Sequence, residues 1–306
     1  MSFALIFLQM LNGLQFGVLL FLLAAGLTLV FGIMSFVNLA HGSLYMLGAY
    51  FAATAFGLSG SFAVAVLAAI GGSVAIGVAV ERVAVSRLYG RDHLDHVLAT
   101  FGMILFFNEA ARMIWGPQPH FLPVPVSLDG TVDILGLAYP AYRFAIIGAG
   151  LLVALGAQWL MHRTRLGMLI RAGAVNPAMV GALGVNIRFL NAFLFALGAA
   201  LAGLAGVMAG PIVSVQPGMG EPVLIATLVV IVIGGIGSVR GAFFAALIVG
   251  MADTLGRTLL PPLLRDVTSR DIADAAGPAL ASMLVYLLMA AILAVRPDGL
   301  FPARRK

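Results

Sequence analysis

The feature that most constrains the fold of this chain is a succession of long apolar runs separated by short polar segments. The nine runs occupy residues 5–31, 36–57, 62–84, 96–115, 141–161, 188–210, 222–239, 241–256 and 278–295. A helix needs about 20 apolar residues to cross a bilayer, and most of the runs are long enough. The run at 241–256 is short, and a glycine-rich join at 234–241 interrupts the pattern. The runs predict an all-α, polytopic membrane protein with eight or nine crossings, some of them broken or short.

The composition agrees with this class and excludes others. Hydrophobic residues make up 62% of the chain and charged residues 9%, whereas a soluble domain carries about 25% charged residues. A transmembrane β-barrel would show alternating segments of about ten residues in place of continuous runs. The chain has no cysteine, which excludes disulfides, thiolate catalysis and cysteine-ligated metals. No polar stretch resembles a soluble domain, so residues 1–306 are predicted to form a single transmembrane domain.

The basic residues are unevenly distributed and nearly all are arginine. The chain has 16 arginines and one lysine, the terminal Lys306. A phosphate-binding P-loop requires an internal lysine, so any ATPase would have to be a separate chain. If the crossings alternate, twelve basic residues share one side, namely Arg82, Arg87, Arg91, Arg163, Arg165, Arg171, Arg188, Arg240, Arg296, Arg304, Arg305 and Lys306. Lys and Arg are retained on the cytoplasmic side, so the C-terminus is predicted to be cytoplasmic. The side of the N-terminus stays open.

Two segments on the opposite side have distinct compositions. Residues 116–140 contain five prolines, which predicts a stiff, extended external loop. Residues 257–274 mix three arginines with three aspartates and are interpreted as a short interfacial helix.

The most basic loop, residues 163–188, has four arginines and no acid. Asn176 and Pro177 are typical of an N-cap and a first helical position, and Gly184 is typical of a left-handed helix end. They predict a short helix over 177–183, uncharged and carrying Met179, Val180 and Leu183. An apolar helix exposed to the cytosol is expected to be covered by another protein.

Two segments are candidates for a translocation pathway. Asn38, His41, Gly42 and Ser43 place polar groups and a glycine inside an apolar stretch. Broken helices at membrane depth line cavities in transporters, although a turn at the membrane interface with His41 reaching water explains the same residues equally well. The second candidate is the join that contains Gly235 and Gly237. Here a tight turn between packed helices is favoured over a discontinuous helix.

Charged residues near the ends of runs have a structural and a functional interpretation. Glu109 and Arg112 lie three residues apart and can pair on one helix face, and a structural pair is favoured. Glu221 followed by Pro222 fits a helix entry better than a role in receiving substrate.

No metal site and no enzyme active site is expected. His93 and His96 lie near two aspartates, but a solvated charged loop explains that spacing better than metal binding. No Ser/His/Asp or paired-carboxylate arrangement stands out.

These motifs together resemble the inner-membrane permease subunits of bacterial branched-chain amino-acid ABC importers, specifically the H-type (LivH-like) half. The resemblance covers nearly the whole chain. It is carried by Gly26-Leu27-Thr28-Leu29-Val30-Phe31-Gly32, by Asn38-Leu39-Ala40-His41-Gly42-Ser43 followed by Leu47-Gly48-Ala49-Tyr50, by Leu183-Gly184-Val185, by Gly234-Gly235-Ile236-Gly237-Ser238 and by Arg296-Pro297-Asp298-Gly299-Leu300-Phe301.

The resemblance implies a role and a set of partners. The chain would form half of a pathway for branched-chain or related amino acids, with an M-type permease as the other half. Two ATP-binding subunits would bind ATP and Mg, and a periplasmic amino-acid-binding protein would deliver substrate. It implies no cofactor in this chain and no nucleic acid; membrane lipid would surround it in the bacterial inner membrane. The coupling residues would be Arg171, Ala172, Asn176, Met179, Val180, Leu183 and Gly184, although the acid that opens better-defined coupling motifs is missing here.

An ion-coupled secondary transporter of small polar solutes is the main alternative. Such a protein usually carries acidic residues within its helices. Glu109, Glu221 and Asp253 all lie near the predicted ends of runs, which makes this alternative weaker.

Overall fold

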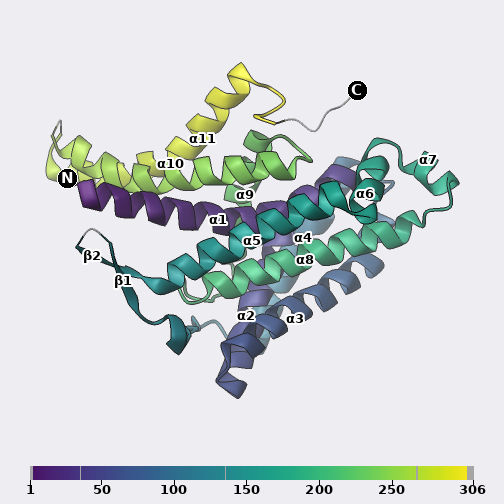
Figure 1. Ribbon diagram of the computed structural model, residues 1–306, viewed down its shortest axis with the longest axis horizontal. Helices are drawn as coiled ribbons and strands as arrows, with labels where there is room; N and C mark the ends of the chain where they lie inside the picture. Colours follow the sequence, from purple (N-terminus) through teal and green to yellow (C-terminus); the bar gives the residue numbers. More distant parts are fainter. Residues whose placement is uncertain (1–2, 35, 135, 267, 302–306) are drawn as a thin grey trace.

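The computed structural model of the chain describes residues 3–34, 36–134, 136–266 and 268–301. These residues form eleven α-helices, two 3-10 turns and one β-hairpin (Figure 1). The helices are α1 (Phe3–Met34), α2 (His41–Ser59), α3 (Phe62–Val83), α4 (His93–Trp115), α5 (Ala141–Arg163), α6 (Arg165–Val175), α7 (Pro177–Ala182), α8 (Ile187–Ala209), α9 (Gly220–Gly234), α10 (Val239–Arg265) and α11 (Arg270–Val295). The turns are η1 (Val85–Arg87) and η2 (Val126–Leu128), and the strands are β1 (Thr131–Ile134) and β2 (Leu137–Pro140).

Nine of the helices correspond to the nine apolar runs, which confirms the predicted all-α, polytopic organisation. In the part of the chain that the structure describes, seven helices are long and apolar enough to cross a membrane. Helix α2 begins with polar residues and α9 has only 15 residues, so these two fall outside that group. The run predicted at 222–239 is shorter in the structure because the helix ends at Gly234.

The predicted interfacial helix at 257–274 was wrong. That segment consists of the end of α10 and the start of α11, with only four residues between them. Ion pairs accommodate the charges: Arg257 to Asp253 at 2.9 Å within α10, and Arg265 to Asp274 at 2.6 Å between the two helices. The charges therefore belong to helix ends, and α10 is a full-length helix where a short run was expected.

The loop at 116–140 is more ordered than the predicted extended segment. Strands β1 and β2 pair in antiparallel register, with Thr131 opposite Pro140. His120 exchanges backbone hydrogen bonds with Val215, so the loop is also attached to the segment between α8 and α9.

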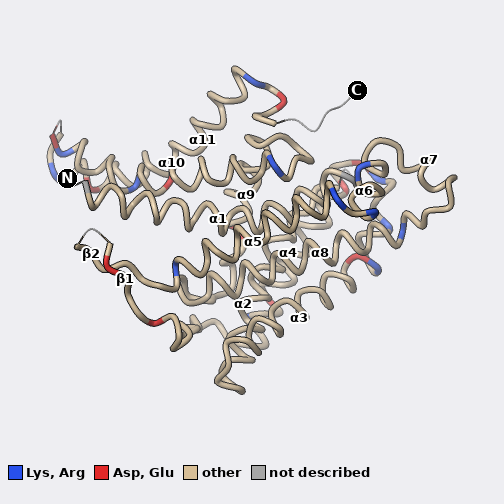
Figure 2. Tube along the Cα trace, viewed as in Figure 1, with Lys and Arg blue, Asp and Glu red and all other residues tan. Residues whose placement is uncertain are grey.

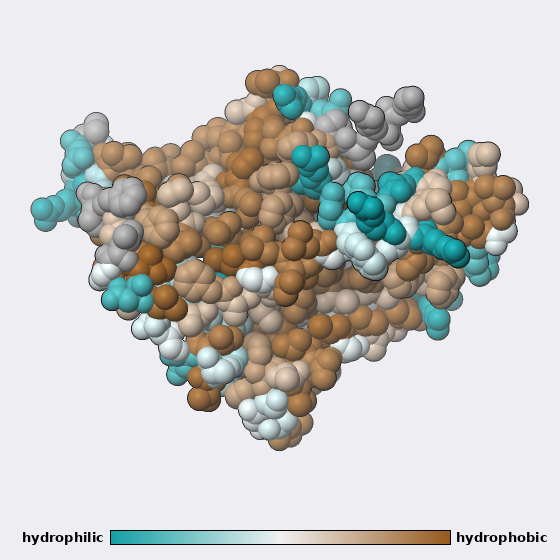
Figure 3. Space-filling model, in the orientation of Figure 1, coloured by the Kyte–Doolittle hydropathy of each residue, from teal (hydrophilic) through white to brown (hydrophobic). Residues whose placement is uncertain are grey.

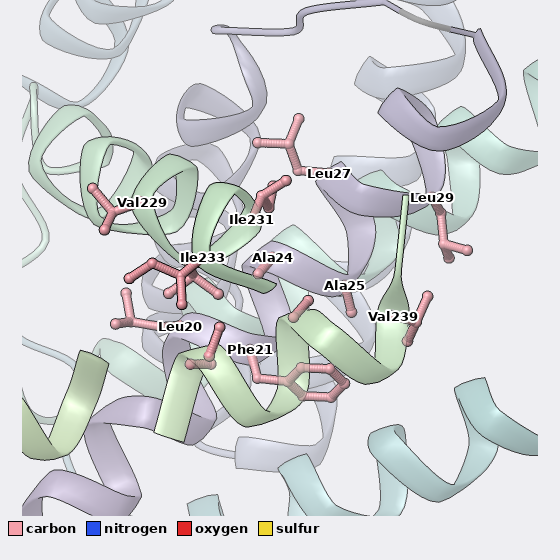
Figure 4. Close-up of a cluster of buried hydrophobic side chains, with 14 of the residues drawn as sticks. Leu20, Phe21, Ala24, Ala25, Leu27, Leu29, Val229, Ile231, Ile233 and Val239 are labelled. Carbon is pink, nitrogen blue, oxygen red and sulfur yellow. The ribbon is translucent and has the colours of Figure 1, made fainter. Parts of the chain in front are cut away.

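Helix α1 forms the centre of the molecule. Most of its side chains from Val18 to Val30 are completely buried. Figure 4 shows part of the cluster around it, in which Leu20, Phe21, Ala24, Ala25, Leu27 and Leu29 lie among side chains of α9 and α10. The ring of Phe21 meets Phe243 of α10 edge to face, with ring centroids 5.1 Å apart.

Glycines let the central helices approach each other closely. A Cβ on Gly26 of α1 would lie 2.9 Å from the carbonyl oxygen of Gly198 in α8, and a Cβ on Gly48 of α2 would lie 2.6 Å from the Cα of Gly203 in α8. Membrane helices associate through such small residues because lipid provides no hydrophobic driving force between them.

Helices α2 and α9 begin inside the helix bundle. The Nε2 atom of His41, the first residue of α2, lies 3.1 Å from the position of a Cβ on Gly26. Gly26 is eight residues before the end of α1, or about 12 Å along that helix. The start of α9 meets the start of α2, because the backbones of Gly42 and Gly220 touch. The segments before these helices, 36–40 and 210–219, therefore enter the bundle from opposite ends.

Basic residues gather at the end of the molecule that contains α6 and α7, defined here as the α6–α7 end (Figure 2). Figure 2 shows arginines gathered around α6. Figure 3 shows hydrophilic residues there beside an apolar tip formed over α7, while most of the visible face of the molecule is apolar, as expected for a surface in contact with lipid.

Candidate functional site

Helix α6 is folded tightly against the end of α5. The Thr164 hydroxyl donates to the Leu160 carbonyl at 2.6 Å and accepts from the Gly167 N–H at 3.0 Å, which caps α6. A Cβ on Gly167 would lie 2.1 Å from the Leu160 oxygen, so only glycine allows this approach. The Ile170 side chain is buried, which fixes α6 to the bundle.

Helix α7 has the predicted capping chemistry. The Asn176 side-chain oxygen accepts a hydrogen bond from the Met179 N–H at 2.9 Å, and Pro177 is the first helical residue. Gly184 has a φ of 88°, the left-handed conformation that favours glycine. The helix ends at Ala182, one residue earlier than predicted.

The exposure of the apolar residues in this loop corrects one assignment. Met179 and Leu183 are 62% and 75% exposed, as a docking surface requires, but Val180 is only 6% exposed. Val180 therefore packs inside the loop and stabilises it, and it is unavailable to a partner. We define the apolar loop surface as the exposed large apolar side chains of residues 163–189, namely Met168, Val175, Met179, Leu183 and Phe189. Met168, Val175 and Phe189 were not among the predicted coupling residues.

Basic, polar and small residues surround this surface. Arg171, Ala172, Asn176 and Gly184, the other predicted coupling residues, are all exposed. Segment 163–188 contains no acid. The arrangement is an apolar tip within a positively charged rim, suited to a partner with an apolar groove and acidic edges.

The second candidate site is a crevice between α2, α4 and α9. Its lining residues are Leu39, Gly42, Ser43, Met46, Ile104, Asn108, Gly220, Glu221 and Leu224. It has no room for a water molecule in this structure. The structure thus places two of the predicted pathway residues, Gly42 and Ser43, in one crevice with two polar residues of other helices, Asn108 and Glu221.

The position of Glu221 differs from the one predicted. Glu221 lies in the first turn of α9 and Pro222 follows it, which confirms the predicted helix entry. This helix start was expected at the outer end of a span, whereas it lies in the crevice, next to the first turn of α2. Asn108 of α4 donates its amide N–H to the Glu221 carboxylate at 2.5 Å. Sequence interpretation considered Glu221 only as a weaker candidate and missed Asn108, although an acid and an amide in apolar runs were the available signal.

Asn38 and His41 are buried without full hydrogen bonding. Their side chains are 2% and 1% exposed, so His41 does not reach water and the interfacial-turn alternative is wrong. Both amide atoms of Asn38, the Nε2 atom of His41 and the hydroxyl of Thr28 in α1 have no hydrogen-bond partner. An unpaired buried polar group costs about 1–3 kcal/mol. Such groups persist where they have a function or where strain is retained.

A polar cluster near η1 holds the segment that leads to Asn38. Phe36 is fully buried between Tyr89 and His96, with ring centroids at 6.1 Å and 4.5 Å. The Tyr89 hydroxyl donates to the buried Glu81 carboxylate at 2.7 Å. Burial, together with the hydrogen bond to Glu81 and its negative charge, raises the pKa of Tyr89. The hydroxyl therefore stays protonated and remains a donor.

His96 is part of this cluster, so it does not lie in a solvated loop as predicted. Its side chain is 3% exposed, and its Nε2 atom lies 2.8 Å from the Leu88 carbonyl oxygen. No group of three or more potential ligands among the described residues could hold a metal ion. At the other end of α4, Glu109 and Arg112 pair at 2.9 Å on an exposed surface, which fits the structural interpretation.

The glycine-rich join between α9 and α10 is a tight turn. Gly235 and Gly237 have φ values of 98° and 83°. The chain near the C-terminus covers the turn: the Leu300 N–H donates to the Ile233 carbonyl at 2.8 Å, and Phe301 lies under the Arg240 guanidinium. Gly235 and Gly237 do not line the crevice that contains Gly42 and Ser43.

The comparisons with known proteins place the chain in a transport family, which is not an enzyme family. The family model described as "Branched-chain amino acid transport system / permease component" matches residues 9–293. The permease protein BraD of the high-affinity branched-chain amino acid transport system of Pseudomonas aeruginosa is 31% identical, over 95% of this chain and 94% of that protein. The corresponding protein LivH of Escherichia coli K12 is 28% identical over the same shares.

A relative with another substrate name also matches. The ribose import permease protein RbsC of Escherichia coli K12 is 30% identical, over 75% of this chain and 71% of that protein. No solved structure matches significantly. With its multi-pass helical fold and a match across nearly its whole length, the chain belongs to the family of branched-chain amino acid transport permease components.

Proposed function

We propose that this chain is the H-type half of an ABC importer for branched-chain amino acids in the bacterial inner membrane. Its partners are an M-type permease, two ATP-binding subunits that hold ATP and Mg, and a periplasmic amino-acid-binding protein. The observation that carries the proposal is the apolar loop surface within a basic rim. Because Lys and Arg mark the cytoplasmic side, the α6–α7 end faces the cytosol, where the ATP-binding subunits are found, and so does the C-terminus.

The packing offers a route from the loop to the crevice. Asn186 caps α8 through a hydrogen bond from the Phe189 N–H to its side-chain oxygen at 3.0 Å, so α7 and α8 are joined by a short, structured connection. Helix α8 then contacts α2 closely: a Cβ on Gly206 would lie 2.2 Å from the Tyr45 carbonyl oxygen. A rigid displacement of α7 by the ATP-binding subunits would pass through α8 to α2, which lines the crevice.

Purification and uptake test the proposal. The chain, expressed with its neighbours, should co-purify with two ATP-binding subunits and should show no ATPase activity alone. In proteoliposomes loaded with ATP, uptake of leucine from the binding protein should require ATP. It should persist in the presence of a protonophore, which collapses the proton gradient. Uptake that collapses with the ion gradient and ignores ATP would instead assign the chain to ion-coupled transport. Ribose, tested in parallel, distinguishes the two substrate classes named among the relatives.

A further inference from the structure

The crevice contains a carboxylate that no cation neutralises. Among the residues that the structure describes, the ion pairs are Arg112 with Glu109, Arg257 with Asp253 and Arg265 with Asp274, and none involves Glu221. The hydrogen-bond partner of Glu221 is the neutral amide of Asn108. An acid within the membrane part of a transporter is costly, and it usually faces a pathway or a charged partner.

The surroundings of Glu221 are apolar apart from a few polar groups. Leu39, Met46, Ile104 and Leu224 line the same crevice as Glu221, and the Ser43 side chain adds a hydroxyl. An apolar pocket with a few placed polar groups is typical of small-molecule sites. A branched aliphatic side chain and a positively charged group are the two chemical features that this lining complements.

We propose that the Glu221 carboxylate receives the α-ammonium group of an amino acid as the substrate passes the crevice. Asn108 donates to the carboxylate in this structure and is displaced when the ammonium binds, so it takes no part in holding the substrate. The inference rests on the proposed function, since it requires an amino-acid substrate. It adds a specificity element within the membrane, because a neutral sugar has no ammonium group for the carboxylate to bind.

A structural interpretation of the same pair makes the opposite prediction for two substitutions. If the pair only clamps α4 to α9, Glu221→Gln should be tolerated, because a glutamine oxygen can still accept from Asn108. Asn108→Ala should then be the damaging change, because it removes the only donor seen on Glu221 among the described residues. If Glu221 binds ammonium, the loss of charge in Glu221→Gln is the damaging change and Asn108→Ala retains the site.

The test uses the complete importer in proteoliposomes, with wild-type binding protein loaded with leucine. The initial rate of ATP-driven uptake should fall about tenfold or more in Glu221→Gln, the expected scale for losing a hydrogen bond to a charged group. Asn108→Ala should stay within about threefold of wild type, and Glu221→Asp, which keeps the charge, should recover part of the rate. Glu109→Gln is the matched control, because it removes an exposed carboxylate one residue away from Asn108 and should leave uptake unchanged.

Assembly is checked by co-purification and by the basal ATPase rate of each complex. Wild-type uptake in Glu221→Gln, or a loss in Asn108→Ala as large as that in Glu221→Gln, would overturn the inference while leaving the proposed function intact. A wild-type complex that imports ribose and no amino acid would overturn both.

Discussion

The backbones of Gly42 and Gly220 touch at the point where α2 and α9 begin. A Cβ on Gly42 would lie 2.6 Å from the Gly220 carbonyl oxygen, and a Cβ on Gly220 would lie 2.2 Å from that of Gly42. Both distances are far below van der Waals contact, and the atoms are backbone, which cannot rotate away. The starts of α2 and α9 therefore meet through a contact that only glycine permits, at the edge of the crevice that holds Glu221.

Alanine at either position should destabilise the permease. Gly220→Ala must separate the starts of α2 and α9, and such overpacking costs about 1–3 kcal/mol. We expect a lower thermal midpoint in detergent and slower uptake in proteoliposomes. Gly57→Ala is the control within α2, because a Cβ there meets no atom within 4 Å and alanine favours the helix. Equal thermal midpoints for Gly220→Ala and Gly57→Ala would contradict the close contact.

The apolar loop surface predicts which substitutions uncouple the importer. Met179→Asp and Leu183→Asp place a charge on exposed apolar side chains, and losing the burial of each would cost about 1.5–3 kcal/mol of docking energy. We expect the ATP-binding subunits to dissociate at least tenfold more readily. Thermal stability of the isolated permease should be unchanged. Binding is measured by titrating purified ATP-binding subunits onto the permease.

Val180→Asp separates docking from folding. Because Val180 is buried, a charge there should unfold the loop and lower the thermal midpoint of the isolated permease. Val126→Asp is the matched control, because Val126 is 95% exposed and belongs to η2, outside α6 and α7. A Val180→Asp protein with unchanged stability would show that this side chain faces outward.

The Tyr89–Glu81 hydrogen bond predicts a pH-dependent contribution to stability. Tyr89→Phe leaves the buried Glu81 carboxylate without its donor, which should cost about 1–3 kcal/mol. The pKa of Tyr89 is raised in the folded protein, so folding favours the protonated phenol. That advantage is fully present below the ordinary tyrosine pKa of about 10 and is lost as the pH rises through the folded value.

Thermal midpoints of wild type and Tyr89→Phe, measured at several pH values, check this. Their difference should be constant between about pH 7 and 9 and should shrink only above about pH 10. A difference that disappears near neutral pH would show that another group controls the cluster.

What the sequence could predict depended on how local the interaction was. The Asn176 cap and the Gly184 helix end were predictable because capping involves neighbours within three or four residues. The burial of Val180 was not predictable, because a helix of six residues is too short for its periodicity to define a buried face.

The crevice could not be predicted for a different reason. Glu221 lies at the end of an apolar run, and its position beside the first turn of α2 follows from the segment 210–219 turning back into the bundle. That path is set by contacts between residues far apart in the chain, such as Gly42 with Gly220 and His120 with Val215. Composition and periodicity record no such contacts. Hydropathy alone therefore identified the helices but placed the acid at a membrane surface.

Asn38 offers a test of whether a buried group is retained for transport at the expense of stability. Both of its amide atoms are buried without a partner, and replacing an unsatisfied polar group by an apolar one of similar shape can be neutral or stabilising. Asn38→Leu should therefore keep or raise the thermal midpoint while ATP-driven uptake falls. His41→Ala should also slow uptake, but with lower stability, because it leaves a cavity beside Gly26. Uptake at the wild-type rate in both variants would reduce this segment to a structural turn, and a large loss of stability in Asn38→Leu would show that its amide is bonded.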